Sequence, residues 1–148
     1  MQGLEQRERR MLYAALALAV VASVLFAPSL LPRGGYGDVT VQKAKLLIED
    51  KPDLVILDVR TESEYEAGHI MDAVNIPVQE LSARFDELSP EDELLVYCRM
   101  GNRSAQAVDI LQDLGFTKIY HMAEGITGWI EAGYPVVKPP TLFSSTSV

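Results

Sequence analysis

The stretch LLVYCRMGNRSAQAV, residues 94–108, contains the pattern that decides the fold. It begins with a continuous apolar run, which is typical of a strand buried on both faces of a sheet. The run ends at Cys98, a short loop follows, and a helix is expected to start near Arg103 or Ser104 and to end at Gly115. The stretch therefore predicts a strand, a loop and a helix in succession, with the only cysteine of the chain at the junction.

The same alternation of strands and helices continues on both sides of this stretch. Apolar runs and amphipathic stretches predict strands at 54–59, 73–76, 94–98 and 118–122, and helices at 41–50, 61–68, 78–88, 103–115 and 125–133. Thr61 and Glu64 have the spacing of a helix capping box. Such alternation indicates a small α/β domain with a mainly parallel sheet between helices.

Two residues with reactive or charged side chains stand at the ends of expected strands. Asp58 ends one buried strand and Cys98 ends another. In parallel sheets of this class, ligands bind at the carboxyl ends of the strands. We therefore expect Asp58 and Cys98 at one edge of the sheet, close to a binding site.

The loop after Cys98 has the features that stabilise a negative charge on sulfur. Unpaired N–H groups and the helix dipole make the N-terminus of a helix electropositive. Gly101 lets the backbone turn and approach an anion, and Arg99 and Arg103 add positive charge. We expect a thiol pKa well below the free value of about 8.5, and a thiolate or another anion held by the loop. The alternative is that Cys98 is an unreactive thiol of the core.

Several segments together resemble the rhodanese-like sulfurtransferases, from about residue 39 to residue 137. The resemblance rests on LLVYCRMGNRS, on LDVRTESEYEAGHI upstream of it, on AVNIP, and on GITGW near the end. It implies a five-stranded parallel sheet with helices on both faces. It also implies that Cys98 takes a sulfane sulfur from a donor such as thiosulfate, carries it as a persulfide, and passes it to a nucleophilic acceptor without a cofactor.

The resemblance also assigns roles to individual residues. The residues implied to bind the persulfide and the anionic donor are Arg99, Met100, Gly101, Asn102 and Arg103. Asp58 and Arg60 are expected to form a supporting ion pair, with direct contact to substrate as the alternative. The sequence supports further, weaker predictions. Glu64 is expected to cap a helix or to pair with Arg60, and His69 to form structural hydrogen bonds. No partner is evident for His121, and Trp129 is expected to pack in the core.

The chain departs from the family pattern at two positions. GHIMDA replaces the frequent GHIPGA, so the resemblance does not imply the conformation of the turn at residues 68–73. Glu124 stands where glycine is common, in a segment that follows a strand end. A carboxylate that approached the pocket from there would repel thiosulfate.

Two other classes of function compete with sulfur transfer. Tyrosine phosphatases place five residues between the catalytic cysteine and the arginine, to surround a phosphate, whereas four lie between Cys98 and Arg103. The shorter loop favours sulfur. The other alternative is a non-catalytic interaction or sulfur-sensing module that docks a membrane partner; the presence of Cys98 argues against it.

The composition of the chain argues against several classes of binding partner. The net charge of −8 argues against nucleic acid as a partner. One cysteine and two distant histidines lack the spacing of a zinc site, so no metal is expected. With no second cysteine, the sulfur must leave to cyanide, a small thiol, sulfite or the cysteine of a partner protein.

The N-terminal segment, residues 1–31, differs from the rest. Three arginines precede the uncharged stretch MLYAALALAVVASVLFA, residues 11–27, and residues 28–31 extend it towards the roughly 20 residues of a membrane span. The arginines predict a cytoplasmic N-terminus and an anchored domain on the extracytoplasmic side. A cleaved signal, giving a secreted or periplasmic protein, and a buried helix are the alternatives. A linker at 32–38, a domain at 39–138 and an irregular tail at 139–148 complete the predicted organisation.

Overall fold

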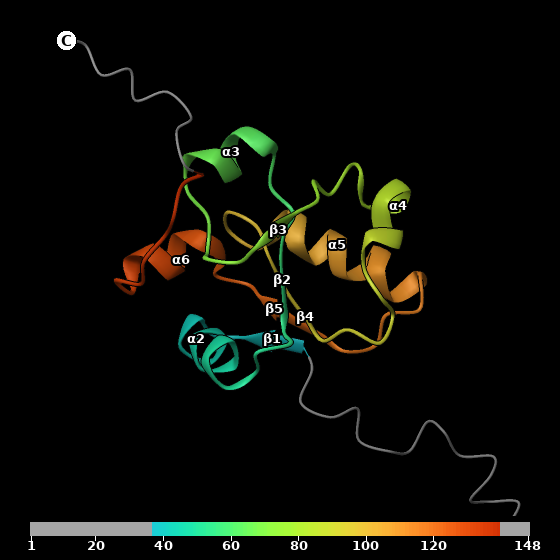
Figure 1. The fold of residues 1–148 in the computed structure, drawn as a ribbon, viewed down its shortest axis with the longest axis horizontal. Coiled ribbons are helices and arrows are strands. Elements are labelled where there is room, and N and C mark those ends of the chain that lie inside the picture. The colour runs from blue at the N-terminus through green and yellow to red at the C-terminus, as the bar shows by residue number, and fades with distance from the viewer. Residues whose placement is uncertain (1–36, 140–148) are drawn as a thin grey trace, which may run out of the picture. The chain divides into compact units, whose positions relative to one another are not determined.

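A five-stranded parallel sheet forms the centre of the computed structural model, which describes residues 37–139 (Figure 1). The strand order is β1-β5-β4-β2-β3. The strands are β1 (Gly37–Val39), β2 (Val55–Asp58), β3 (Val74–Asn75), β4 (Leu94–Tyr97) and β5 (Ile119–Met122). Every strand pair is parallel, as the alternating pattern of the sequence predicts.

Helices cover both faces of the sheet (Figure 1). They are α2 (Val41–Asp50), α3 (Glu62–Ala67), α4 (Leu81–Arg84) with the 3₁₀ turn η1 (Phe85–Glu87), α5 (Asn102–Asp113) and α6 (Gly125–Glu131). Successive side chains of a strand point to opposite faces, so β4 feeds two cores. Leu94 and Val96 pack with residues of α4 and α5, whereas Leu95 and Tyr97 pack with residues of α2 and α6.

The ends of the helices follow the local chemistry of the sequence. The Thr61 side chain accepts from the backbone N–H of Glu64, and the Glu64 carboxylate accepts from the N–H of Thr61, so the predicted capping box is present. In α2 the predicted apolar face is confirmed, because Val41, Ala44 and Leu47 are buried.

Several boundaries differ from the prediction, among them the following three. Residues 37 and 38 belong to β1 rather than to a linker; this strand is only GDV, whose glycine and aspartate have low strand propensity, and it forms by pairing with the distant β5. Helix α5 begins at Asn102, because Gly101 rather than a later residue caps it. The helix expected over residues 78–88 is confined to α4 and η1.

The turn that departs from the family pattern keeps a glycine-like backbone. Asp72 has a φ of 63°, the one positive value of a residue other than glycine between residues 37 and 139. Aspartate tolerates this left-handed conformation better than most residues. The replacement of glycine by Asp72 therefore leaves the turn in a conformation that glycine also adopts.

The predicted anchor, residues 1–31, and most of the predicted tail lie outside the described residues. Within residues 37–139, no helix is both long and apolar enough to cross a membrane.

Candidate active site

The candidate site is the loop between β4 and α5, at the carboxyl edge of the sheet. Cys98 directly follows β4 and is 1% exposed. Its Sγ accepts a hydrogen bond from the Gly101 N–H at 3.2 Å and one from the Ser104 hydroxyl at 3.3 Å. The predicted geometry, a sulfur at the N-terminus of a helix, is therefore present.

These donors decide the acidity of the thiol. Burial raises the pKa of the Cys98 thiol, because a thiolate is poorly solvated inside the protein. The hydrogen bonds from Ser104 and from the backbone N–H groups of the loop outweigh burial, and they lower the pKa below its ordinary value. The expectation of a stabilised thiolate rests on these donors more than on the arginines.

Two glycines allow the loop to pack against the segment that follows β5. Gly101 has a φ of +92°, and a Cβ there would lie 2.3 Å from the carbonyl oxygen of Ala123. Gly125 has a φ of +62°, and a Cβ there would lie 2.3 Å from the carbonyl oxygen of Arg99. No other residue fits either position without a shift of backbone, so the two segments hold each other in place.

The first turn of α6 completes this packing. The Ile126 N–H donates to the Cys98 carbonyl at 2.9 Å, and the Thr127 N–H donates to the Arg99 carbonyl at 3.2 Å. The carbonyl groups of the loop are thereby turned towards α6. The N–H of Gly101 is left to face the sulfur.

The two arginines of the loop have different surroundings. Arg99 is exposed, and its guanidinium forms no hydrogen bond or ion pair with the described residues. Arg103 instead forms two hydrogen bonds with the Glu64 carboxylate, at 2.7 and 2.8 Å. The ion-pair partner of Glu64 is therefore Arg103. Of the two roles expected for Glu64, the helix cap is confirmed and the pair with Arg60 is not formed. Arg103 contributes less free positive charge than its sequence position suggests.

The remaining loop residues, Met100 and Asn102, point outward. Met100 is 62% exposed, and Asn102 is the exposed first residue of α5.

Asp58 and Arg60 form the expected ion pair, and both are buried. The shortest contact joins Arg60 Nη2 to Asp58 Oδ2 at 2.6 Å, and the same Nη2 donates to the Gly68 carbonyl at 2.8 Å. The Asn75 side chain donates to the backbone carbonyls of both residues at 2.9 Å. Burial lowers the pKa of Arg60, but the Asp58 carboxylate outweighs it and raises the pKa overall. The pair joins β2 to the end of α3, and Asn75 joins β3 to the same stretch of backbone.

Two histidines differ in how well the sequence predicted them. The structural role of His69 is confirmed: Nδ1 bonds the Tyr65 carbonyl at 2.9 Å, and the ring stacks on Tyr65. No partner for His121 was evident from the sequence, and the structure shows two. Its Nε2 lies 2.9 Å from the Ser104 hydroxyl, and its Nδ1 lies 2.7 Å from Asp38 Oδ1.

Glu124 does not have the role expected for it, which was to approach the pocket and repel an anionic donor. The N–H of Val41 donates to Glu124 Oε2 at 2.7 Å, so this carboxylate caps α2. The prediction that Glu124 repels an anionic donor is therefore not supported by its position. Trp129 is buried as predicted, and its indole N–H donates to the Pro135 carbonyl at 2.9 Å.

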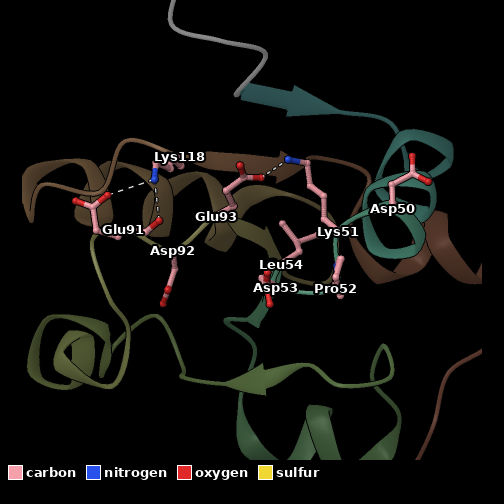
Figure 2. A pocket seen from close by; sticks show the side chains of 9 residues that line it. All are labelled: Asp50, Lys51, Pro52, Asp53, Leu54, Glu91, Asp92, Glu93 and Lys118. Carbon is pink, nitrogen blue, oxygen red and sulfur yellow. Dashed lines mark hydrogen bonds and ion pairs between the residues drawn. The ribbon is translucent and has the colours of Figure 1, made fainter.

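Two of the hollows among the described residues lie at opposite edges of the sheet. One adjoins the cysteine loop and is lined by Arg60, Arg99 and residues of α3 and α6. Figure 2 shows the other, at the amino ends of β2, β4 and β5, where Lys118 pairs with Glu91 and Lys51 pairs with Glu93. Cys98 lines neither hollow, but the first one adjoins its loop through Arg99, and its two arginines face two glutamates. The second hollow has five carboxylates against two lysines. The hollow beside Arg99 is the candidate entrance for an anion.

The family model of the rhodanese-like domain matches residues 40–132, which include the whole cysteine loop. The chain belongs to the rhodanese-like family. The described sheet, with helices on both faces, is the fold that the resemblance implied.

Several relatives of this rhodanese-like chain are named as sulfurtransferases. It is 33% identical to a sulfurtransferase of Allochromatium vinosum over 92 residues, which cover 62% of this chain and 86% of the relative. It is 34% identical to the thiosulfate sulfurtransferase PspE of Escherichia coli over 84 residues, 55% of this chain and 77% of that protein. The structure of the human single-domain sulfurtransferase TSTD1 matches with a TM-score of 0.59 and 32% identity, over 66% of this chain and 97% of that one.

Proposed function

We propose that this rhodanese-like protein is a sulfurtransferase in which Cys98 carries a sulfane sulfur as a persulfide. The observation that carries the proposal is the buried Sγ, which accepts hydrogen bonds from the Gly101 N–H and the Ser104 hydroxyl. The names of its relatives favour transferase chemistry over a purely structural role.

In the loading step the Cys98 thiolate attacks the outer sulfur of thiosulfate. A bond forms between Sγ and that sulfur, the S–S bond of thiosulfate breaks, and sulfite leaves with the bonding electron pair. The product is a persulfide whose terminal sulfur is anionic near neutral pH. The N–H and O–H groups that converge on Sγ stabilise the thiolate that attacks in this step and that is formed again on discharge.

In the discharge step an outside nucleophile attacks the terminal sulfur. With cyanide, a C–S bond forms, the S–S bond of the persulfide breaks, and thiocyanate leaves while the Cys98 thiolate is regenerated. A small thiol, sulfite or a cysteine of a partner protein would accept the sulfur in the same manner. Cys98 is the only cysteine, so no second thiol of the chain competes for the sulfur.

The loop residues divide this work. Gly101 supplies a backbone N–H to the sulfur, and Arg99 supplies positive charge at the entrance for the anionic donor. Arg103, paired with Glu64, holds the start of α5 against α3. Asp58 and Arg60 hold the sheet edge beside the loop, and Arg60 also lines the entrance. Met100 and Asn102 form the outer surface of the loop, where donor and acceptor arrive.

The test is thiocyanate formation from thiosulfate and cyanide by the full chain in detergent. We expect turnover by the wild-type protein and none above background by Cys98→Ser. Turnover by Cys98→Ser would refute the assignment of Cys98 as carrier. Absence of turnover by the wild-type protein both with thiosulfate and with an inorganic polysulfide as the donor would favour the non-catalytic module.

We also propose that residues 1–31 anchor the protein in a membrane with the domain on the extracytoplasmic side. The uncharged stretch at 11–27 and the arginines before it support this topology. Protease added to intact cells should cleave the domain. Cleavage only after lysis would reverse the topology, and release of the domain into the soluble fraction would favour a cleaved signal.

A further inference from the structure

A row of polar side chains leads from the surface to the buried sulfur. Asp38 of β1 contacts His121 of β5, His121 contacts Ser104 of α5, and Ser104 contacts Cys98. The Ser104 residue is fully buried and His121 is 8% exposed, whereas the Asp38 side chain is 78% exposed. Four segments of the chain thus contribute to one hydrogen-bonded row.

The number of protons in this row determines what Ser104 does. A hydroxyl carries one hydrogen, yet three acceptors surround the Ser104 Oγ: Cys98 Sγ at 3.3 Å, the Gly101 carbonyl at 2.9 Å and His121 Nε2 at 2.9 Å. Only one of them receives that hydrogen at a time. If one of these three neighbours donates a hydrogen bond to Oγ instead of accepting one, the Ser104 hydroxyl can donate its hydrogen to one of the remaining two.

Asp38 fixes which nitrogen of His121 carries a proton. A carboxylate is only an acceptor, so the Nδ1 atom that lies 2.7 Å from Asp38 Oδ1 must carry a hydrogen. Nε2 of a neutral ring would accept the Ser104 hydrogen and take it away from the sulfur. Nε2 of a protonated ring would donate to Oγ, and the hydroxyl would then be free to donate to Sγ.

We propose that His121 and Asp38 are positioning residues that direct the Ser104 hydroxyl at the anionic sulfur of Cys98. They act through Ser104 and do not touch the sulfur themselves. The charged groups that face the imidazole are Asp38 from β1 and, through Ser104, the thiolate that follows β4. This inference deepens the proposed sulfur transfer and rests on it for its role with the persulfide, but its effect on the bare thiolate is independent of any donor.

The test is the ultraviolet absorbance of the Cys98 thiolate as a function of pH, on the full chain in detergent. Cys98 is the only thiol, so Cys98→Ser supplies the blank for tyrosine ionisation. His121→Leu removes the donor to Oγ, and Ser104→Ala removes the hydroxyl. Each should raise the thiol pKa by about one unit, a tenfold loss in the thiolate-to-thiol ratio.

The double variant separates positioning from packing. If His121 acts through Ser104, then His121→Leu in the Ser104→Ala background should produce no further rise. His121→Gln, whose amide N–H is able to donate to Oγ, should retain part of the wild-type value. Asp38→Asn should raise the thiol pKa by less than His121→Leu, and Asp53→Asn, at the opposite edge of the sheet, should not raise it.

Two results would overturn the proposal: a wild-type thiol pKa in His121→Leu, or additive effects of the two substitutions. Urea unfolding of each variant shows whether it is folded, and His121→Met, which likewise has no donor, substitutes if His121→Leu does not fold. No sulfur donor is present in this measurement. Its failure would therefore leave the proposed sulfur transfer intact, and a failure of sulfur transfer would leave the thiolate result intact.

Discussion

At the sulfur of Cys98 two opposing effects meet. Burial favours the neutral thiol, while hydrogen bonds from Ser104 and the loop favour the thiolate, and the pKa is lowered because the hydrogen bonds prevail. Each of these donors depends on the exact path of the loop. The reactivity of the residue is therefore set by backbone geometry as much as by neighbouring charge.

The residue that tests this geometry is Gly101. We expect Gly101→Ala to reduce sulfur loading at least tenfold and to lower the free energy of unfolding by about 2 kcal/mol or more, because its Cβ meets a backbone carbonyl at a strained φ. Gly115 is a matched control: it has a φ of +94°, but a Cβ there meets nothing within 4 Å. Gly115→Ala should cost about 1 kcal/mol and leave loading unchanged. Equal loading by the two variants would contradict the account.

Arg99 tests the contribution of free positive charge. Arg99→Gln should slow loading by thiosulfate roughly tenfold at low salt, because the entrance loses electrostatic attraction for a dianion. The loss should shrink as salt is added. Stopped-flow measurement of sulfite release would give the loading rate at each salt concentration. Arg99→Lys should retain most of the rate, and Lys43→Gln, the same charge change on α2, should leave it unchanged. An unchanged rate in Arg99→Gln would show that the donor is recognised by the backbone alone.

At the scale of elements, the site is assembled by side chains that join neighbouring segments. Glu64 of α3 holds Arg103 of α5, and Asp58 and Arg60 join the sheet to the end of α3. The hydrogen bond with Arg103 lowers the pKa of Glu64 from 4.5 to about 2. A carboxyl whose pKa is lower in the folded than in the unfolded chain stabilises the fold above the unfolded value, and this contribution is lost as the pH falls.

Stability against pH tests the contact between α3 and α5. Glu64→Gln should lower the free energy of unfolding at neutral pH, and the difference from wild type should decline between pH 4.5 and about 2. Urea unfolding across this range measures it. Glu62→Gln lies in the same helix without an ion pair among the described residues, and it should show a smaller pH-dependent difference. A difference in Glu64→Gln that is constant with pH would show that the pair contributes nothing through charge.

Local patterns were sufficient to predict most elements and the position of Cys98. The apolar run and the loop after it are consecutive in sequence, and so are Asp58 and the residues that follow it. The prediction failed where contacts are distant: Asp38 and His121 are 83 residues apart, and β1 forms only by pairing with β5. Arg103 and Glu64 are likewise 39 residues apart, so nothing in the spacing distinguished Arg103 from Arg60 as the partner. A short strand of glycine and aspartate has no periodicity to reveal it.

At the scale of the whole molecule, the described domain concentrates its chemistry at one edge of the sheet. The loop of Cys98, the Asp58–Arg60 pair and the entrance at Arg99 lie at the carboxyl ends of the strands, whereas the opposite edge has the acidic hollow of Figure 2. In the proposed function, the one thiol at this edge accepts a sulfur atom and releases it to an acceptor outside the chain. The central claim is therefore that the protein exists transiently as a Cys98 persulfide.

Intact-protein mass spectrometry of the full chain after treatment with thiosulfate tests that claim most directly. We predict a gain in mass of one sulfur atom in the wild-type protein, its absence in Cys98→Ser, and its removal by cyanide with one equivalent of thiocyanate. A polysulfide donor is tested in parallel. A gain in mass from polysulfide alone would mean that Cys98 carries sulfur but takes it from a donor other than thiosulfate. No gain in mass from either donor, or an equal gain in Cys98→Ser, would contradict the account.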